Sequence, residues 1–163
     1  MRASSRSIED RLRRLEDIDA IRRLKMAYAR LVDTRCDAQE LADLFTEDAV
    51  MDMGPWGRYE GRAAIRAFFA DFLQQSSGVI LHYVTNHEID VQESGLEATD
   101  RCLIWNPTTV QGEALLGTST QLHRLRKVDG RWIIAEMRVE AHFLTPLVPG
   151  WIEAPNVSVA AGN

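Results

Sequence analysis

The chain has 163 residues, of which 45% are hydrophobic and 26% charged, a composition typical of one globular domain with a sizeable core. Its 24 acidic and 19 basic residues give a net charge of −5 without a basic stripe, which argues against a nucleic-acid partner. Two cysteines, Cys36 and Cys102, lack metal-ligand spacing and indicate reduced thiols. No apolar stretch suits a signal peptide or a membrane span, so we expect a soluble, cytoplasmic protein with no membrane partner.

The first half of the chain mixes helical and extended patterns. Apolar side chains recur every three or four positions between Leu12 and Leu31, which predicts one long helix that ends near Asp33. An aromatic stripe with the same spacing begins after Gly61 and predicts another helix. The other elements predicted here are a short helix over 38–45 and a strand over 49–53, followed by a Gly-Pro-Trp-Gly break at 54–57.

From residue 79 the period changes to two. Helices followed by strands indicate an α+β fold, and a long antiparallel sheet curls, so three helices packed on it would form a cone with a hollow inside. We expect a single domain over 1–145, with 1–11 as a candidate mobile segment, and a tail over 146–163 that is a flap or disordered. The four predicted strands run over 79–92, 96–110, 113–128 and 131–145, with a hairpin signal at Asp129-Gly130.

The segment LHYVTNHEIDV, residues 81–91, places His82 and His87 five positions apart on a predicted strand. Side chains alternate between the faces of a strand, so this odd spacing directs the two rings to opposite sides. Only one ring would then face the hollow. A bulge after Asn86 would change the facing of His87.

Three stretches resemble the SnoaL-like branch of the NTF2-like superfamily. They are YARLVDTRCDAQELADLFTEDAVMDM (28–53), YEGRAAIRAFF (59–69), and LHYVTNHEIDV with the later VDGRWII (128–134). The resemblance covers roughly residues 12–145 and implies a cone-shaped α+β barrel. It does not specify an activity, because this superfold includes cyclases, isomerases, dehydratases, dioxygenase small subunits and binding proteins.

One subset of this superfamily suggests a site. The bile-acid and scytalone dehydratases use a Tyr and an Asp near the end of the first long helix and a His on the strand after the third helix. Tyr28, Asp33 and His82 match these positions, so the resemblance implies that they are catalytic and that His82 faces the hollow. Those relatives carry an acidic residue or a second histidine on the next strand, where this chain offers only Trp105 or Asn106. Their exact substrates are therefore not implied.

Acid–base chemistry is what the side chains favour. The sequence shows no metal-ligand cluster, P-loop or dinucleotide fingerprint, so we expect neither a metal nor a cofactor. An imidazole titrates near pH ~6.5 and can accept a proton α to a carbonyl. Asp33 would orient the ring of His82 and stabilise its charged form. Tyr28 would polarise the carbonyl or support a leaving hydroxyl.

The predicted pocket wall combines methionines with aromatic side chains, which suits a planar or polycyclic hydrophobic substrate. Arg138 is either an exposed charge or an anchor for a carboxylate or phenolate at the cone mouth. The predicted substrate-binding residues are Asn106, Trp105, Trp56, Tyr59, Met51, Met53, Phe68, Phe72 and Arg138, with Phe143 as a further wall candidate.

Three function classes remain open. The leading one is a cofactor-independent lyase of the dehydratase type acting on a hydrophobic hydroxylated aromatic or polycyclic molecule, with an aldehyde-releasing C–C lyase as a close variant. The second is a ketosteroid-type isomerase, and the third is a non-catalytic small-molecule-binding or accessory protein. The apolar positions of the last strand, 133–143, also predict a homo-oligomer, either a dimer or a trimer.

Overall fold

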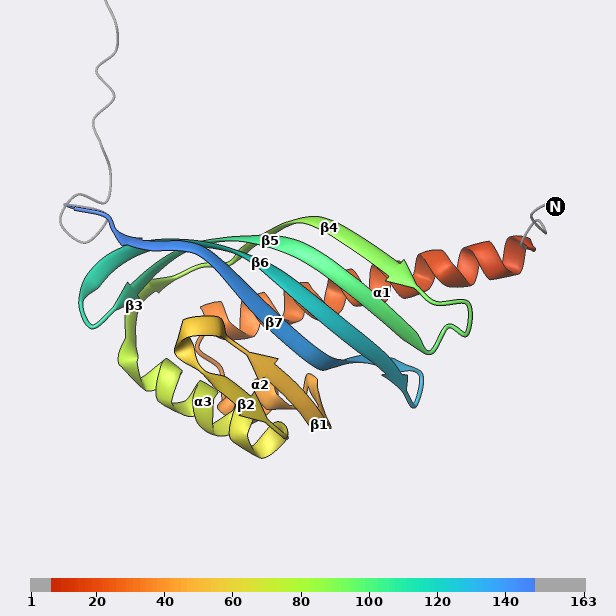
Figure 1. Cartoon of the computed structure of the whole chain (residues 1–163), viewed down its shortest axis with the longest axis horizontal. Coiled ribbons are helices and arrows are strands. Elements are labelled where there is room, and N and C mark those ends of the chain that lie inside the picture. Colours follow the sequence, from red (N-terminus) through yellow and green to blue (C-terminus); the bar gives the residue numbers. More distant parts are fainter. Residues whose placement is uncertain (1–6, 149–163) are drawn as a thin grey trace, which may run out of the picture.

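The computed structural model describes residues 7–148, with the helices and most of the sheet in separate layers (Figure 1). Residues 1–6 and 149–163, which hold part of the predicted mobile start and most of the predicted tail, lie outside the described residues. The helices are α1 (Ile8–Asp33), α2 (Ala38–Ala42) and α3 (Arg62–Gln75), with a 3-10 turn η1 (Gly54–Trp56). The strands are β1 (Phe45–Asp52), β2 (Arg58–Glu60), β3 (Ser76–Ile80), β4 (Tyr83–Val91), β5 (Glu97–Val110), β6 (Glu113–Val128) and β7 (Arg131–Pro146).

The seven strands form one curved, unclosed sheet. Their order is β2-β1-β7-β6-β5-β3, and β4 also pairs with β5. Every pairing is antiparallel except that between β1 and β7, which is parallel. The long strands β5, β6 and β7 arch over α1 and α3 (Figure 1). The predicted α+β class and cone shape are therefore confirmed, and none of the described helices is long and apolar enough to cross a membrane.

Two tight turns set the register of the sheet. Val110 pairs with Glu113 and Val128 with Arg131, so each hairpin has a two-residue loop. The loop residues, Gln111-Gly112 and Asp129-Gly130, all have positive φ. Such loops match the right-handed twist of the flanking strands, which explains why Asp-Gly at 129–130 was a reliable turn signal.

The core lies where the buried face of α1 meets the sheet and α3. Ile21, Lys25, Tyr28 and Val32 follow one another at helical spacing and are all buried. The ring of Tyr28 contacts those of Phe45 (β1) and Phe69 (α3) edge-on, with centroids 6.4 and 6.1 Å away. These contacts hold the second half of α1 under the sheet.

Two predicted boundaries are wrong for physical reasons. The second helix ends at Ala42 rather than at residue 45, because Phe45 already pairs with Ile134 of β7 and is fully buried. The predicted strand over 79–92 is two strands, β3 and β4, separated by Leu81 and His82. The backbone N–H of His82 donates to Asp33 Oδ2 (3.1 Å), so a side chain of α1 replaces a strand partner at this residue.

A bulge in β4 reverses the predicted facing of His87. Asn86 has a φ of 54°. Thr85 pairs with Leu103 and Glu88 with Arg101, so β4 holds one more residue than β5 between these pairs. After the bulge His87 is in phase with the inward-facing Val91. Its Nδ1 lies 3.0 Å from the buried Asp100 Oδ1. The prediction from simple alternation, that the two rings face opposite sides of the sheet, is therefore wrong, and the structure has the alternative with a bulge after Asn86.

Candidate active site

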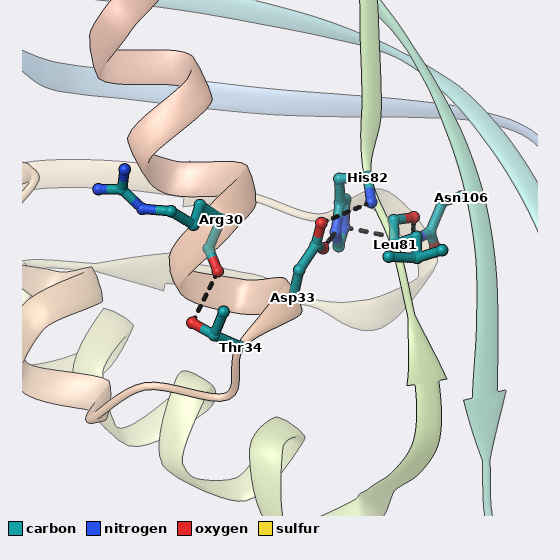
Figure 2. Close-up of polar contacts among 6 residues, drawn as sticks. All are labelled: Arg30, Asp33, Thr34, Leu81, His82 and Asn106. Carbon is teal, nitrogen blue, oxygen red and sulfur yellow. Dashed lines mark hydrogen bonds and ion pairs between the residues drawn. The ribbon is translucent and has the colours of Figure 1, made fainter.

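Asp33, the last residue of α1, holds His82 at two points (Figure 2). Its Oδ1 lies 2.7 Å from Nδ1 of the imidazole, and its Oδ2 accepts the backbone N–H of the same residue at 3.1 Å. The side chain of His82 is only 13% exposed and that of Asp33 only 21%. Because both the ring and its backbone are bound to one carboxylate, the imidazole has a fixed orientation at the junction of β3 and β4.

The hydrogen bonds around His82 indicate which ring nitrogen carries the proton. A carboxylate can only accept, so Asp33 favours a hydrogen on Nδ1. On the other side Asn106 donates its amide N–H to the Leu81 carbonyl (2.9 Å), which identifies that amide atom as the nitrogen, and the same atom lies 3.4 Å from Nε2 (Figure 2). Nε2 is then the acceptor. The arrangement leaves the imidazole with a basic nitrogen away from Asp33.

His82 and Asn106 border a cavity of about 670 Å³ between α3 and the inner faces of β5, β6 and β7. This volume suits a small organic molecule, and the walls are mainly apolar. The predicted wall residues that line it are Met53, Trp56, Tyr59, Phe68, Phe72 and Phe143. His87 does not line it. Of the two histidines in the segment 81–91, only His82 reaches the cavity.

Two predicted site residues belong to the core instead. Met51 is fully buried in β1, and Tyr28 is 5% exposed among aromatic rings; neither lines the cavity. The ammonium of Lys25 lies 4.3 Å from the centroid of the Tyr28 ring. Burial raises the pKa of Tyr28 well above its usual range, so its hydroxyl stays protonated.

Two others lie away from the cavity on exposed positions. Trp105 pairs with Tyr83 of β4, and both are exposed. Arg138 forms an ion pair with Glu140 (3.3 Å) and has a side chain that is 58% exposed, beside a separate hollow. Between the two interpretations of Arg138, the structure supports an exposed charge.

The sequence analysis missed the β6 side of the cavity. Gly117, Ser119 and Gln121 all line it. The signal was present, because the two-residue loop at 111–112 pairs Asn106 with Gly117, and alternation then places the next odd-numbered residues on the same face.

Behind this wall lies a buried polar cluster. Lys25 is fully buried, and its Nζ donates to Gln121 Oε1 at 2.9 Å. Asp100 lies between two imidazoles: His87 Nδ1 is 3.0 Å from its Oδ1, and His123 Nδ1 is 3.4 Å from its Oδ2. The cluster therefore combines one ammonium, one carboxylate and two imidazoles inside the fold.

Burial and mutual charge set the protonation of this cluster. Burial lowers the pKa of Lys25 to about 8, against the pull of the Cys102 and Asp100 charges. Burial, together with the charge of Lys25, lowers the pKa of His123 to about 4. Burial would raise the pKa of Asp100, but the two imidazoles outweigh it and hold that pKa below its usual range. Near neutral pH, Lys25 and Asp100 are thus the charged pair and His123 is neutral.

Two members of this cluster, together with Cys102, also have the composition of a metal site. His87, Asp100 and Cys102 each offer one ligand atom, all within 4.8 Å of one another. A nitrogen, an oxygen and a sulfur would suit a borderline divalent cation. However, the charge of Lys25 acts on both Asp100 and Cys102, and it opposes a second positive charge there. These side chains fit an internal charge network better than a cation site.

The lowered pKa of His123 predicts an acid-sensitive fold. The unfolded chain binds a proton on this ring at about pH 6.5, whereas the folded chain does so only near 4. Stability is therefore fully present above 6.5 and is lost as the pH falls towards 4. His123→Gln should reduce that loss by up to about 3 kcal/mol, from ~1.4 kcal/mol per pKa unit. Urea unfolding at several pH values between 7 and 4 measures it.

The matched control is His142→Gln, which removes an exposed imidazole bound to the Thr120 hydroxyl (3.0 Å). This control should keep the acid dependence of the wild type. If His123→Gln and wild type lose stability in parallel over the whole range, His123 is not held neutral by the fold.

Comparison with known proteins identifies a family for the sequence. The sequence matches the SnoaL-like domain over residues 13–138. No curated protein sequence matches the chain significantly.

Solved structures with the same fold cover most of the chain. A protein from Novosphingobium aromaticivorans, provisionally assigned as an aromatic ring hydroxylase, is 29% identical, with 83% of this chain and 96% of that chain covered and a TM-score of 0.74. A provisionally assigned scytalone dehydratase from the same species is 23% identical, with 83% and 90% covered and a TM-score of 0.76. A hexachlorocyclohexane dehydrochlorinase from Novosphingobium barchaimii is 20% identical, with 83% and 93% covered and a TM-score of 0.73.

Proposed function

Because the chain belongs to the SnoaL-like domain family, we propose that it is a cofactor-independent lyase that eliminates water from a hydrophobic hydroxylated aromatic or polycyclic molecule. The observation that carries the proposal is the Asp33–His82 pair, fixed by two hydrogen bonds at the wall of a largely apolar cavity. Such a pair is suited to proton abstraction, because the carboxylate stabilises the imidazolium that forms.

The proposed reaction needs one base and one acid. Nε2 of His82 takes a proton from the carbon next to an activating group, and the C–H electron pair forms the new double bond as the β-hydroxyl leaves. The imidazolium then returns its proton to the leaving oxygen, which departs as water, so charge and protons balance. Once Nε2 holds the proton it no longer accepts from Asn106, so the amide N–H that faced it is released and can donate to an oxygen at the reacting end.

Tyr28 has no contact with the substrate in this proposal. Its ring is buried between Phe45 and Phe69, away from the cavity lining. Tyr59 does line the cavity, and its hydroxyl donates to the Trp56 carbonyl at 2.7 Å. Tyr59 therefore shapes the wall with a fixed ring.

The names of two structural neighbours support an elimination reaction. A dehydratase removes water and a dehydrochlorinase removes hydrogen chloride, and both reactions are eliminations. The alternatives are an isomerase, an aldehyde-releasing C–C lyase and a binding protein without turnover. Mass spectrometry of reactions with a panel of hydroxylated aromatic and polycyclic compounds separates them, since loss of water, unchanged mass, loss of an aldehyde and no product are distinct.

We also propose a homo-oligomer, a dimer or a trimer, in the cytoplasm. The apolar positions of β7 do not support this as predicted, because Met137 and Val139 pack into the core. The support comes from the outer face of the sheet, where Tyr83 and Trp105 are neighbours and 53% and 46% exposed. Large apolar side chains grouped on a surface are typical of an interface.

The first catalytic prediction concerns His82. His82→Ala should lower turnover by ~10²–10⁴-fold, the usual share of a general base, while the fold persists. His142→Gln is the control, because this exposed imidazole is not at the cavity, and it should keep wild-type turnover. Turnover is measured as product formed per folded protein. Wild-type turnover in His82→Ala would refute the proposed base.

The second prediction concerns Asp33. Asp33→Asn keeps the shape but removes the charge that stabilises the imidazolium, so turnover should fall nearly as far as in His82→Ala. Residues that act as a unit are non-additive, so the double variant should be little worse than either single variant. Asp19→Asn, which removes an exposed carboxylate of α1 paired with Arg23, is the matched control. Unchanged turnover in Asp33→Asn would mean that the carboxylate only ends the helix, and a binding protein would then be the better conclusion.

A further inference from the structure

A fully buried lysine supports one wall of the cavity from behind. Lys25 of α1 has no exposed surface, and its ammonium donates to Gln121 Oε1 of β6 at 2.9 Å. Gln121 lines the cavity, whereas Lys25 does not. An ammonium costs several kcal/mol to bury unless it is well compensated. The charge of Asp100 supplies compensation, and the hydrogen bond to Gln121 supplies an acceptor.

The lysine determines how the amide of Gln121 is oriented. The oxygen and nitrogen of an amide are hard to tell apart by shape, but an ammonium can only donate, so the atom facing Lys25 is the oxygen. The amide nitrogen is then the free end. It has no hydrogen-bond partner within the part of the chain that the structure describes, yet it is not among the unpaired polar atoms that are shut off from solvent. It therefore borders open space, and that space is the cavity.

The free amide lies far from the reacting end. Lys25 is eight residues before Asp33 on one helix, which at ~1.5 Å per residue is about 12 Å. Gln121 is four residues beyond Gly117, the partner of Asn106, which at ~3.3 Å per residue is about 13 Å along β6. The two estimates agree. The cavity thus has a polar group at each of two places separated by roughly the length of a fused-ring molecule.

We propose that Gln121 is an anchor subsite, which binds a carbonyl or phenolate oxygen at the far end of an elongated apolar substrate. In this proposal Lys25 is the positioning residue, because it holds the oxygen of the Gln121 amide and so directs the amide N–H groups into the cavity. The inference rests on the proposed function only for the reacting end at His82. Such a subsite would select substrates that carry two oxygen functions at opposite ends of a rigid hydrocarbon frame. The nearby ammonium polarises the amide and strengthens it as a donor.

Rigid ligands of defined length test this subsite directly. Androstenedione carries a ketone at each end of a fused-ring frame, and its two monoketone analogues each lack one of these oxygens. Calorimetric titration of the full-length protein with the three ligands gives two ratios of dissociation constants, one for each oxygen. Wild type should bind the diketone about tenfold more tightly than each monoketone, the usual value of a good hydrogen bond.

The variants assign each oxygen to a residue. Gln121→Leu should reduce one of the two ratios to about one and leave the other unchanged, because only one oxygen meets the amide. Lys25→Met should reduce the same ratio, since the amide is then free to turn. Gln74→Leu changes an exposed glutamine of α3 that does not line the cavity and should keep both ratios.

Stability must be separated from recognition. Gln121→Leu leaves a buried ammonium without its acceptor and can lower the melting temperature. The double variant Lys25→Met/Gln121→Leu removes the ammonium together with its acceptor and leaves Asp100 to its two imidazoles, so it should recover part of the melting temperature but not the lost ratio. Failure of the diketone to bind wild type, equal binding of all three ligands, or full retention of both ratios in Gln121→Leu would each overturn the proposal.

The binding ratios and the turnover of His82→Ala together test the anchor at Gln121 separately from the proposed base. His82→Ala should keep the ratio that depends on Gln121, because the two residues act on opposite ends of the ligand. A retained ratio together with wild-type turnover in His82→Ala would refute the proposed base and leave the anchor intact. Loss of turnover in His82→Ala with no ratio that depends on Gln121 would do the reverse.

Discussion

The carboxylate of Asp33 makes two hydrogen bonds to a single residue, and both the fold and the site depend on them. One binds the imidazole of His82, and the other takes the backbone N–H that would otherwise extend the sheet. The strand pattern stops at that residue, and β3 and β4 become separate strands. The end of α1, the break in the sheet and the orientation of the proposed base are therefore one structural unit.

The charges inside the domain are arranged along α1. Its last residue holds an imidazole at the cavity, and two turns earlier Lys25 holds an amide at the same cavity. The charge of Asp100 compensates that of Lys25. The imidazoles of His87 and His123, which lie beside Asp100, stay behind the cavity wall. A largely apolar cavity can therefore present a basic nitrogen at one place and N–H donors at another, while the ammonium of Lys25 itself stays behind the wall.

The sequence was informative where the chemistry is local. Helical spacing, alternation and Asp-Gly at a hairpin predicted the α+β cone, and the family resemblance predicted that Asp33 meets His82. Two features were harder to read. The sequence allowed a bulge after Asn86, but alternation alone could not decide between a regular strand and the phase shift that the left-handed Asn86 produces in β4. Lys25 interrupts an apolar stripe, and lysines are so rarely buried that sequence reasoning places them in solvent. For Tyr28, its place on the apolar stripe of α1 was the better guide: its ring lies in the core, whereas the family resemblance had placed it in the site.

The rigidity of α1 has a consequence for how relatives could diverge. An anchor supported from this helix must lie on its inner face, and neighbouring positions on that face are three or four residues apart. Moving the support by one residue would turn it about 100° away from the cavity. The distance between the anchor and the reacting end, which sets the length of the ligand, can therefore change only in steps of one helical turn, roughly 5 Å. Divergence along this axis would be discrete, so the lengths of the ligands that related proteins accept would differ by whole steps rather than by single carbon atoms.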